Sequence, residues 1–341
     1  MRYYDIILTS PVTGDVYVVD PKTRRFVPSK TATTTYSAAN QNTSALDVEL
    51  DIPVVSYAAP QGGAHVRIYG VSLQELSQTS DLMGMQVTIK AGMQRGLPLV
   101  NPQQSGIIAT GLVFQAYGNW TGTEMVMDLV IQPDVGTITE PKNVTFTWVK
   151  GTSFWQAIKE TLKTYTGFSV KILMSSDIVA DRDYAGSYDT LSTLCRSIKD
   201  FTQVTGAPGT NTTTGNSYPG VDIAPVGKIL YVFDGTAQQT PTKIDFKDIV
   251  GQPTWVAPFQ VAFSTVMRAD IQVGSQVSLP AQLTAPYVQT TQSAALPVGS
   301  PRNKLTFNGT FNVTEVHHFG HFRQPDAASW VTQIVGTTNP K

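Results

Sequence analysis

The sequence predicts a mainly β protein into which a small α/β domain is inserted. Short runs of β-branched and aromatic residues, separated by glycine and proline, fill the first and last thirds of the chain. Between them, residues 136–235 change to the spacing of amphipathic helices. We therefore expect three domains: a β domain over residues 1–135, an α/β domain over 136–235 and a second β domain over 236–341.

Composition and charge exclude several classes of protein. Of the 341 residues, 41% are hydrophobic and 14% are charged, so the chain has enough apolar residues for a folded core. A net charge of −1 argues against a strongly basic nucleic-acid binder and against a polybasic membrane-surface protein. The single cysteine cannot form an internal disulfide. No apolar stretch of about 18 residues occurs, so we expect no membrane insertion.

Alternation and turn residues define the elements of the first domain. Apolar residues alternate with charged ones over 48–52, which is typical of a half-buried strand that ends at Pro53. Ser72 and Glu75 have the spacing of a capping box and predict a short helix. Residues 30–45 lack apolar periodicity, so we expect a surface loop or an extended arm there. The other expected strands are 6–8, 16–19, 65–69, 85–90, 106–114 and 124–131.

Two amphipathic helices predict the α/β domain. Ser153 has N-cap spacing to Gln156, and Gly167 ends the first helix. The second helix is expected to start near Tyr188 and to carry an apolar stripe. The stripe consists of Leu191, Leu194, Cys195, Ile198 and Phe201, the expected strands are 168–173 and 229–233, and the expected loop is 204–222.

Strand-like runs return in the last domain, and no repeat with a period of about 20–50 residues is found along the chain. Residues 280–300 are rich in Pro, Ala, Ser and Thr, which predicts a loop. The expected strands are 259–263, 269–273, 276–279, 304–307, 311–319 and 330–335.

The densest group of chemically active side chains is His317, His318 and His321. Three imidazoles so close together could bind zinc or nickel. In a strand, however, His317 and His318 point to opposite faces, and Gly320 disfavours the helix that would bring His317 beside His321. We interpret the group as strand histidines and predict no metal site.

No other motif indicates catalysis. Asp181 and Asp183 could do acid–base chemistry, but a solvated turn is the expected role of two carboxylates in such a loop. Cys195 lies on an apolar stripe, which predicts an inert buried thiol. Neither a nucleophile elbow nor a glycine-rich phosphate loop occurs. We therefore predict no catalytic residue, no cofactor and no enzymatic activity. Aromatic residues that could form a binding platform, but for which core or interface positions are expected, are Trp120, Trp155, Trp255 and Trp330.

The order of short segments in the last third of the chain resembles a known family. The segments are 249–253, 273–279, 311–318 and 330–332. Their order is similar to the C-terminal part of the baseplate hub proteins of contractile-tailed phages, of the type found in Mu-like and T-even phages. His318 and Gly320 match that pattern, whereas His321 stands where the family has an acidic residue. Residues 66–70, 85–93 and 106–111 resemble the first barrel of these hubs, and the insert around Trp155 and Leu191 also fits.

The resemblance implies a structural role without catalysis. Hub proteins consist of two tail-tube-like β-barrel domains with an α/β domain inserted, and they form homotrimers. Six barrels then adapt a sixfold tail tube to a threefold spike, around a channel for the genome and, before it, the tape-measure protein. The implied partners are the central spike protein and the tail tube or a tube-initiator protein. The implied location is the tail baseplate of a virion that is assembled in the host cytoplasm.

Two other functions stay open from the residues themselves. A carbohydrate- or receptor-binding tail-tip protein would need exposed aromatic side chains in one groove, for which Tyr117 and Trp120 are candidates. A hydrolase of cell-wall polymers would need a carboxylate pair, for which Asp181 and Asp183 are the candidates. Composition alone makes 30–45, 204–222 and 280–300 the expected contact arms.

Overall fold

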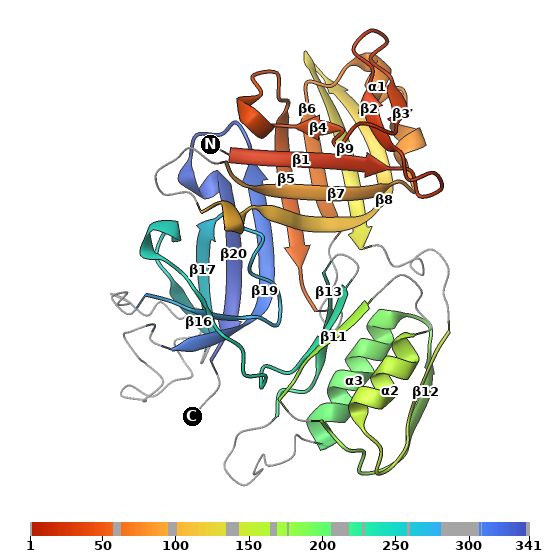
Figure 1. Cartoon of the computed structure of the whole chain (residues 1–341), viewed down its shortest axis with the longest axis vertical. Coiled ribbons are helices and arrows are strands. Elements are labelled where there is room, and N and C mark those ends of the chain that lie inside the picture. The colour runs from red at the N-terminus through yellow and green to blue at the C-terminus, as the bar shows by residue number, and fades with distance from the viewer. Residues whose placement is uncertain are drawn as a thin grey trace.

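The computed structural model describes residues 2–56, 63–94, 101–133, 143–163, 169–175, 177–205, 218–226, 229–257, 260–280, 307 and 309–338. Strands dominate both terminal regions, and the two longer helices lie in the middle of the chain (Figure 1). The expected class, mainly β with an α/β insert, is therefore confirmed. Within the described ranges, none of the helices has the length and hydropathy of a membrane span.

The first region is an antiparallel arrangement of strands with one short helix. Ser72 caps this helix as the sequence predicts: its hydroxyl accepts from the Glu75 N–H, and the Glu75 carboxylate accepts from the Ser72 N–H. The elements are β1 (Arg2–Thr9), β2 (Val16–Val19), β3 (Phe26–Ser29), β4 (Tyr36–Ser37), β5 (Asp47–Val54), β6 (Ala64–Tyr69), α1 (Leu73–Leu76), β7 (Gln86–Met93), β8 (Gly106–Thr121) and β9 (Glu124–Pro133).

The insert places two helices between two small sheets (Figure 1). Its elements are β10 (Val144–Trp148), α2 (Phe154–Leu162), β11 (Ser169–Leu173), β12 (Tyr184–Tyr188), α3 (Leu191–Thr205), β13 (Asp222–Val226) and β14 (Ile229–Phe233). β10 pairs with β12, whereas β14 lies between β11 and β13. The Ser153 hydroxyl caps α2 by accepting from the Gln156 N–H.

The last region continues the sheet of the first. Its elements are β15 (Thr242–Lys243), β16 (Thr254–Ala257), β17 (Gln260–Val266), β18 (Gln276–Ser278), β19 (Thr310–His321) and β20 (Trp330–Thr337). The strand order is β16-β17-β20-β19-β5-β6-β9-β8-β7-β1-β2-β3. The antiparallel pairing of β19 with β5, from Val316 opposite Val54 to His321 opposite Glu49, is called the seam below.

The described pairings form an open path of strands from β16 to β3. The two tube-like barrels therefore stay predictions, as do the domain boundaries at residues 135 and 235. Side chains nevertheless cross between the regions. Met267 and Trp330 belong to the hydrophobic cluster of the first region, and Trp330 Nε1 donates to the Gly92 carbonyl at 3.0 Å. Tyr231 and Phe233 of the insert belong to the cluster of the last region.

The segment 30–45, expected to be a surface loop or an extended arm, is held on the core at a few of its residues. β4 pairs with β1, and Tyr36, Ala38 and Ala45 are buried in the first cluster. The few apolar residues of this segment are enough to hold it on the core, although they have no regular spacing. Of the other two predicted arms, residues 206–217 and 281–300 lie outside the described residues.

Three element boundaries also differ. Residues 269–273 form a bend instead of a strand, with Ile271 and Val273 buried. α3 starts at Leu191, because Tyr188 still pairs with Val144 in β12. β5 continues through Pro53, where it pairs with β19 but no longer with β6, an edge-like position that tolerates proline.

Candidate functional site

One face of the sheet carries polar side chains on each of eight neighbouring strands, from β16 to β8, and is called the polar face below. Asp47, Glu49 and Asp51 of β5 point to it, whereas the residues between them point into the first hydrophobic cluster. Pairing of the strands places residues in rows. One row is His321, Glu49, Arg67, Asp128 and Tyr117, and the next is Phe319, Asp51, His65, Val130 and Gln115.

The polar face is acidic, although the chain as a whole is nearly neutral. Within the described residues it carries six carboxylates but one guanidinium, that of Arg67. Phosphate binding requires basic contacts, so this surface disfavours tight binding of DNA. The carboxylates are those of Asp47, Glu49, Asp51, Glu124, Asp128 and Glu315, and the histidines on the same face are His65, His317 and His321.

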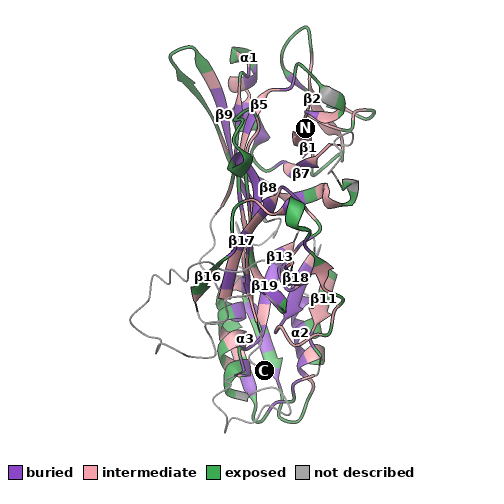
Figure 2. Cartoon of the chain, turned by 90° about the vertical axis from the view of Figure 1, so that its left-hand side faces the viewer, coloured by how far each residue is buried: buried purple, intermediate pink, exposed green. Residues whose placement is uncertain are grey.

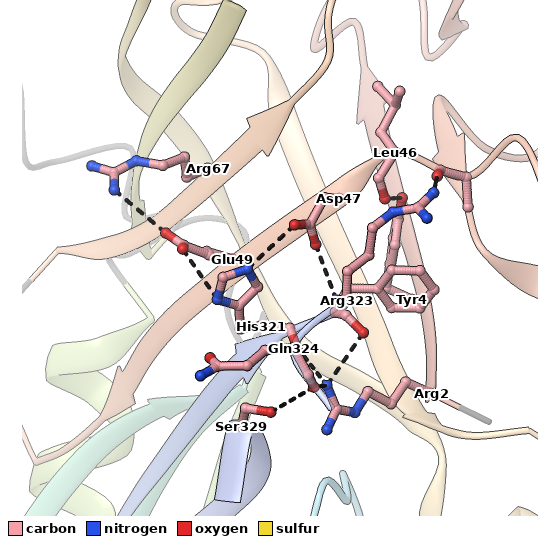
Figure 3. A network of polar contacts seen from close by, with 12 residues as sticks. Arg2, Tyr4, Leu46, Asp47, Glu49, Arg67, His321, Arg323, Gln324 and Ser329 are labelled. Atoms are coloured by element: carbon pink, nitrogen blue, oxygen red, sulfur yellow. Dashed lines mark hydrogen bonds and ion pairs between the residues drawn. The ribbon is translucent and has the colours of Figure 1, made fainter. Parts of the chain in front are cut away.

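His321 lies at the centre of a polar network across the seam (Figure 3). Its Nε2 is 3.2 Å from Asp47 Oδ2, and its Nδ1 is 3.3 Å from Glu49 Oε1. Its ring stacks on Tyr69 with 6.5 Å between the ring centroids. Glu49 also accepts from Arg67 Nη1 at 3.4 Å. These contacts connect β19, β5 and β6 and help to fix the register of the seam.

Arg67 extends this network to β9. Its Nε donates to Asp128 Oδ1 at 2.8 Å, and this hydrogen bond raises the pKa of Arg67. Asn119 Nδ2 on β8 donates to the other oxygen of Asp128 at 3.5 Å. Charges of opposite sign therefore face each other along the row, which favours this strand pairing over a shifted one.

Two arginines hold the connection between β19 and β20 against the first region (Figure 3). Arg2 Nη1 donates to the carbonyl of His321 at 2.7 Å and to that of Phe322 at 3.3 Å. The backbone N–H of Arg323 donates to Asp47 Oδ1 at 3.1 Å. Partial burial lowers the pKa of Arg2. The seam is thus closed by contacts at its end as well as along its length.

The adjacent histidines point to opposite faces, as predicted from the strand. His317 Nε2 lies 2.5 Å from Asp51 Oδ1 on the polar face. His318 is buried, and its Nδ1 is 3.0 Å from Thr332 Oγ1. Burial, with a smaller contribution from His317, lowers the pKa of His318 to about 3. Among the residues that the structure describes, no group of three or more His, Cys, Asp or Glu could hold a metal ion.

An open pocket of about 430 Å³ lies in the polar face beside the seam. Carboxylates, imidazoles, a guanidinium and a phenyl ring form its walls, so it combines charged groups with an apolar surface. Its lining residues are Glu49, Leu50, Asp51, His65, Arg67, Asp128, Phe319, Gly320 and His321.

The polar face ends at an unpaired edge of β8. Beyond Leu112, β8 pairs within the described residues with β9 alone. The turn after α1 lies beside this edge, because the Gly84 N–H donates to the Val113 carbonyl at 2.8 Å. The connection from β8 to β9 is an exposed end of the molecule (Figure 2). Exposed apolar side chains on this edge and on the adjoining helix and turn are Leu73, Met83, Phe114 and Trp120.

The opposite end of the polar face is β16. This strand and the segment before it cover the outer side of β17, since Thr254 pairs with Ala262 and the Val250 N–H donates to the Ser264 carbonyl at 2.9 Å. β16 has no further strand beside it in the described part of the chain. Val256 of β16 is exposed, as is Phe246 in the preceding turn.

The surroundings of Asp181, Asp183 and Cys195 favour structural roles for these side chains. Asp181 accepts from the Tyr184 hydroxyl at 2.8 Å, and this hydrogen bond lowers the pKa of Asp181. Asp183 accepts from the Lys150 N–H at 2.7 Å. A lowered pKa disfavours the protonated form that a general acid needs. Complete burial raises the pKa of the Cys195 thiol, which disfavours the reactive thiolate.

The two exposed aromatic candidates do not share a groove. Tyr117 lies opposite Asp128 on the polar face, whereas Trp120 lies opposite Met125 on the other side of the sheet. Trp120 is exposed, and its Nε1 donates to the Gly122 carbonyl at 3.0 Å. The remaining candidates pack in or against hydrophobic clusters: Trp155, Trp255 and Trp330.

Sequence reasoning did not identify the polar face or its pocket. The sequence shows the alternation over residues 48–52 and the group of three histidines. Each of these patterns, however, describes one strand only and does not indicate which strand lies beside it. What brings Asp47, Glu49 and His321 together is the seam, a pairing of segments more than 260 residues apart. No local pattern contains that information.

No protein-family model matches the chain, and no curated protein matches it. Solved structures with a similar fold include a tail protein from Neisseria meningitidis MC58, with 8% identity and a TM-score of 0.49, covering 98% of this chain and 96% of that one. A 43 kDa tail protein of prophage MuSo2 from Shewanella oneidensis has 7% identity, a TM-score of 0.49 and the same coverage.

A third similar structure is the E. coli c3393 protein, described as a component of the type VI secretion system with structural similarity to T4 bacteriophage tail proteins gp27 and gp5. It has 8% identity and a TM-score of 0.47, and the match covers 89% of this chain and 76% of that one.

Proposed function

We propose that the chain is a structural virion protein: a trimeric baseplate hub that joins the sixfold tail tube to the threefold central spike of a contractile-tailed phage. The ring forms a channel through which first the tape-measure protein and then the genome pass. Its partners are two further copies of itself, the spike protein and the tail tube or a tube-initiator protein. The hub has no catalytic role.

The observation that carries this proposal is a pair of sheet edges, β16 and the second half of β8, beside which the described residues form no further strand. All neighbours along the eight strands from β16 to β8 are antiparallel, so β16 and β8 run in opposite directions. A β8 edge placed beside the β16 edge of the next copy would therefore continue an antiparallel sheet. Such head-to-tail contacts form a ring when the rotation between copies closes.

The side chains at the two edges support contact between copies. Long exposed edges otherwise favour uncontrolled pairing, and natural proteins cover or blunt them. Here Phe114 and Trp120 are exposed at one edge and Val256 at the other. Exposed apolar groups gathered at a free edge are typical of a protein–protein interface.

The charge of the polar face supports the channel. If the ring closes with this face inward, its six carboxylates and single described guanidinium line the lumen. A lining with few basic contacts lets DNA pass without tight binding, because phosphate affinity depends on such contacts.

The first test is the absolute mass of the purified protein by light scattering, alone and mixed with the spike protein from the same source. A threefold mass in either sample is expected. The double variant Phe114→Glu/Trp120→Glu should remain folded but monomeric, since charges at the β8 edge oppose burial. The control Val179→Glu introduces the same charge at an exposed apolar residue of the insert, and it should leave the trimer intact. A monomer in both wild-type samples, or a trimer of the double variant, would contradict the proposal.

A further inference from the structure

The pocket in the polar face is complete within one copy of the chain. Its walls come from β19, β5, β6 and β9, which are neighbours in the sheet. Contacts across the seam fix these strands, so the pocket is formed before any partner arrives. An inference about it therefore goes beyond the proposed ring and does not depend on it.

The charged groups of the pocket leave an excess of negative charge. Arg67 is already engaged by Asp128 at 2.8 Å and by Glu49 at 3.4 Å. The side chain of Asp51 is 57% exposed, and the polar partner described for it is the ring of His317. Three carboxylates thus face one guanidinium, and the most accessible carboxylate lies at the open side.

Phe319 gives the pocket an apolar wall. It is 41% exposed, and it lies opposite Asp51 in the strand pairing. A phenyl ring beside a carboxylate suits a group that has an apolar stem and a positive end. The stem packs on the ring, the charge pairs with the carboxylate, and the ring itself attracts a cation.

We infer that this pocket binds a lysine or arginine side chain of an extended protein segment that lies along the polar face. The exposed carboxylate of Glu315 lies on the same face as the pocket and on the same strand as Phe319, so a segment with several basic residues finds more than one partner. Exposed Tyr117 on the same face offers a further apolar contact. A small polyamine would match the charge but would not need the ring of Phe319.

The test is calorimetric titration of the full chain with a short peptide in which lysine and leucine alternate. The titration is done at about pH 8 and about 50 mM salt, where screening is weak. The acetyl-lysine form of the peptide controls for charge. Asp51→Asn and Phe319→Ala should each weaken binding about fivefold. Two matched controls remove a carboxylate elsewhere: Glu124→Gln on the polar face outside the pocket, and Glu160→Gln in the exposed part of α2. Each control should change the affinity for the peptide less than about twofold.

The inference is overturned if Asp51→Asn and Phe319→Ala bind the peptide as wild type does. It is also overturned if Glu124→Gln weakens binding as much as Asp51→Asn does. The same holds if spermidine, at the same concentration of positive charge as the peptide, displaces the peptide. In either case the face would act only as a surface for counter-ions. Thermal unfolding checks that each variant is folded. Light scattering on the same samples reports the ring separately, so failure of the pocket and failure of the hub can be told apart.

Discussion

At the scale of residues, the position of a side chain on its strand decides its chemistry. His317 and His318 are adjacent, yet one faces carboxylates on the polar face and the other is buried beside Thr332. Burial lowers the pKa of His318 to about 3, whereas a histidine in an unfolded chain titrates near about 6.5. Between these values the unfolded chain holds a proton that the folded chain lacks.

Stability should therefore fall as the pH falls below about 6.5, by up to about 1.4 kcal/mol per pH unit from His318. Between pH 7.5 and pH 5 this group should lower the free energy of unfolding by about 2 kcal/mol. Urea unfolding at both pH values measures it. His318→Asn, which lacks a titrating ring, should lose about 2 kcal/mol less than wild type over that interval.

Thr332→Val is the matched control for this measurement. It removes the hydroxyl beside His318 but leaves the imidazole buried, so the free energy of unfolding should drop at both pH values with the same pH dependence. A wild-type pH dependence in His318→Asn would show that another group is responsible.

The orientation and burial of several of these side chains could be predicted from the sequence. The opposite orientation of His317 and His318 follows from the period of a strand, and the inert surroundings of Cys195 follow from its apolar stripe. The neighbours of His321 could not be predicted, because Asp47 and Glu49 belong to a strand near the other end of the chain.

At the scale of elements, β8 shows how tightly the strands of the first region approach each other. A methyl group on Gly111 would lie 2.1 Å from the carbonyl oxygen of Gln132 in β9. This contact is with backbone, so no side chain can move aside. Gly118 serves a similar purpose farther along β8, since a methyl group there would lie 2.7 Å from Leu76 of α1.

Gly111→Ala should therefore lower the free energy of unfolding by about 3 kcal/mol, because β8 and β9 must separate locally. Thr121→Ala, at the exposed end of the same strand, should change it by less than about 0.5 kcal/mol. Urea unfolding of both variants checks this. Equal stability of Gly111→Ala and wild type would mean that β9 shifts without cost.

Elements with strong local signals were predicted well. The caps at Ser72 and Ser153 act within one turn of their own helices, and the burial pattern of β5 alternates as expected. Residues 269–273 were predicted wrongly as a strand. Ile271 and Val273 are buried in the cluster of the last region, and no described strand pairs with the segment. Burial and strand pairing leave the same apolar signature over so few residues.

At the scale of the whole molecule, the first and last regions depend on each other. β19 pairs with β5, Trp330 belongs to the first cluster, and the ring of Phe322 contacts that of Tyr4 with 4.9 Å between their centroids. The division of the chain into three parts was visible in the sequence as changes of period. The contacts that join those parts were not, because they connect distant segments.

A fragment of residues 1–135 should therefore fail to fold alone. Without the last region, β5 has an open edge and the first cluster lacks Met267 and Trp330. Near-ultraviolet circular dichroism and urea unfolding should show no cooperative transition for the fragment, in contrast to the full chain. A cooperative transition in the fragment would mean that the seam is an accessory contact.

The geometry of the seam also has a mechanical consequence. A pulling force along the strand direction loads the hydrogen bonds between β19 and β5 in shear, so they must break together. A force across the strands would open them one after another, from the end where Val316 lies opposite Val54 or from the end held by Arg2. The molecule should thus be stiff along its strands and weaker across them, and single-molecule pulling in the two directions can measure that anisotropy.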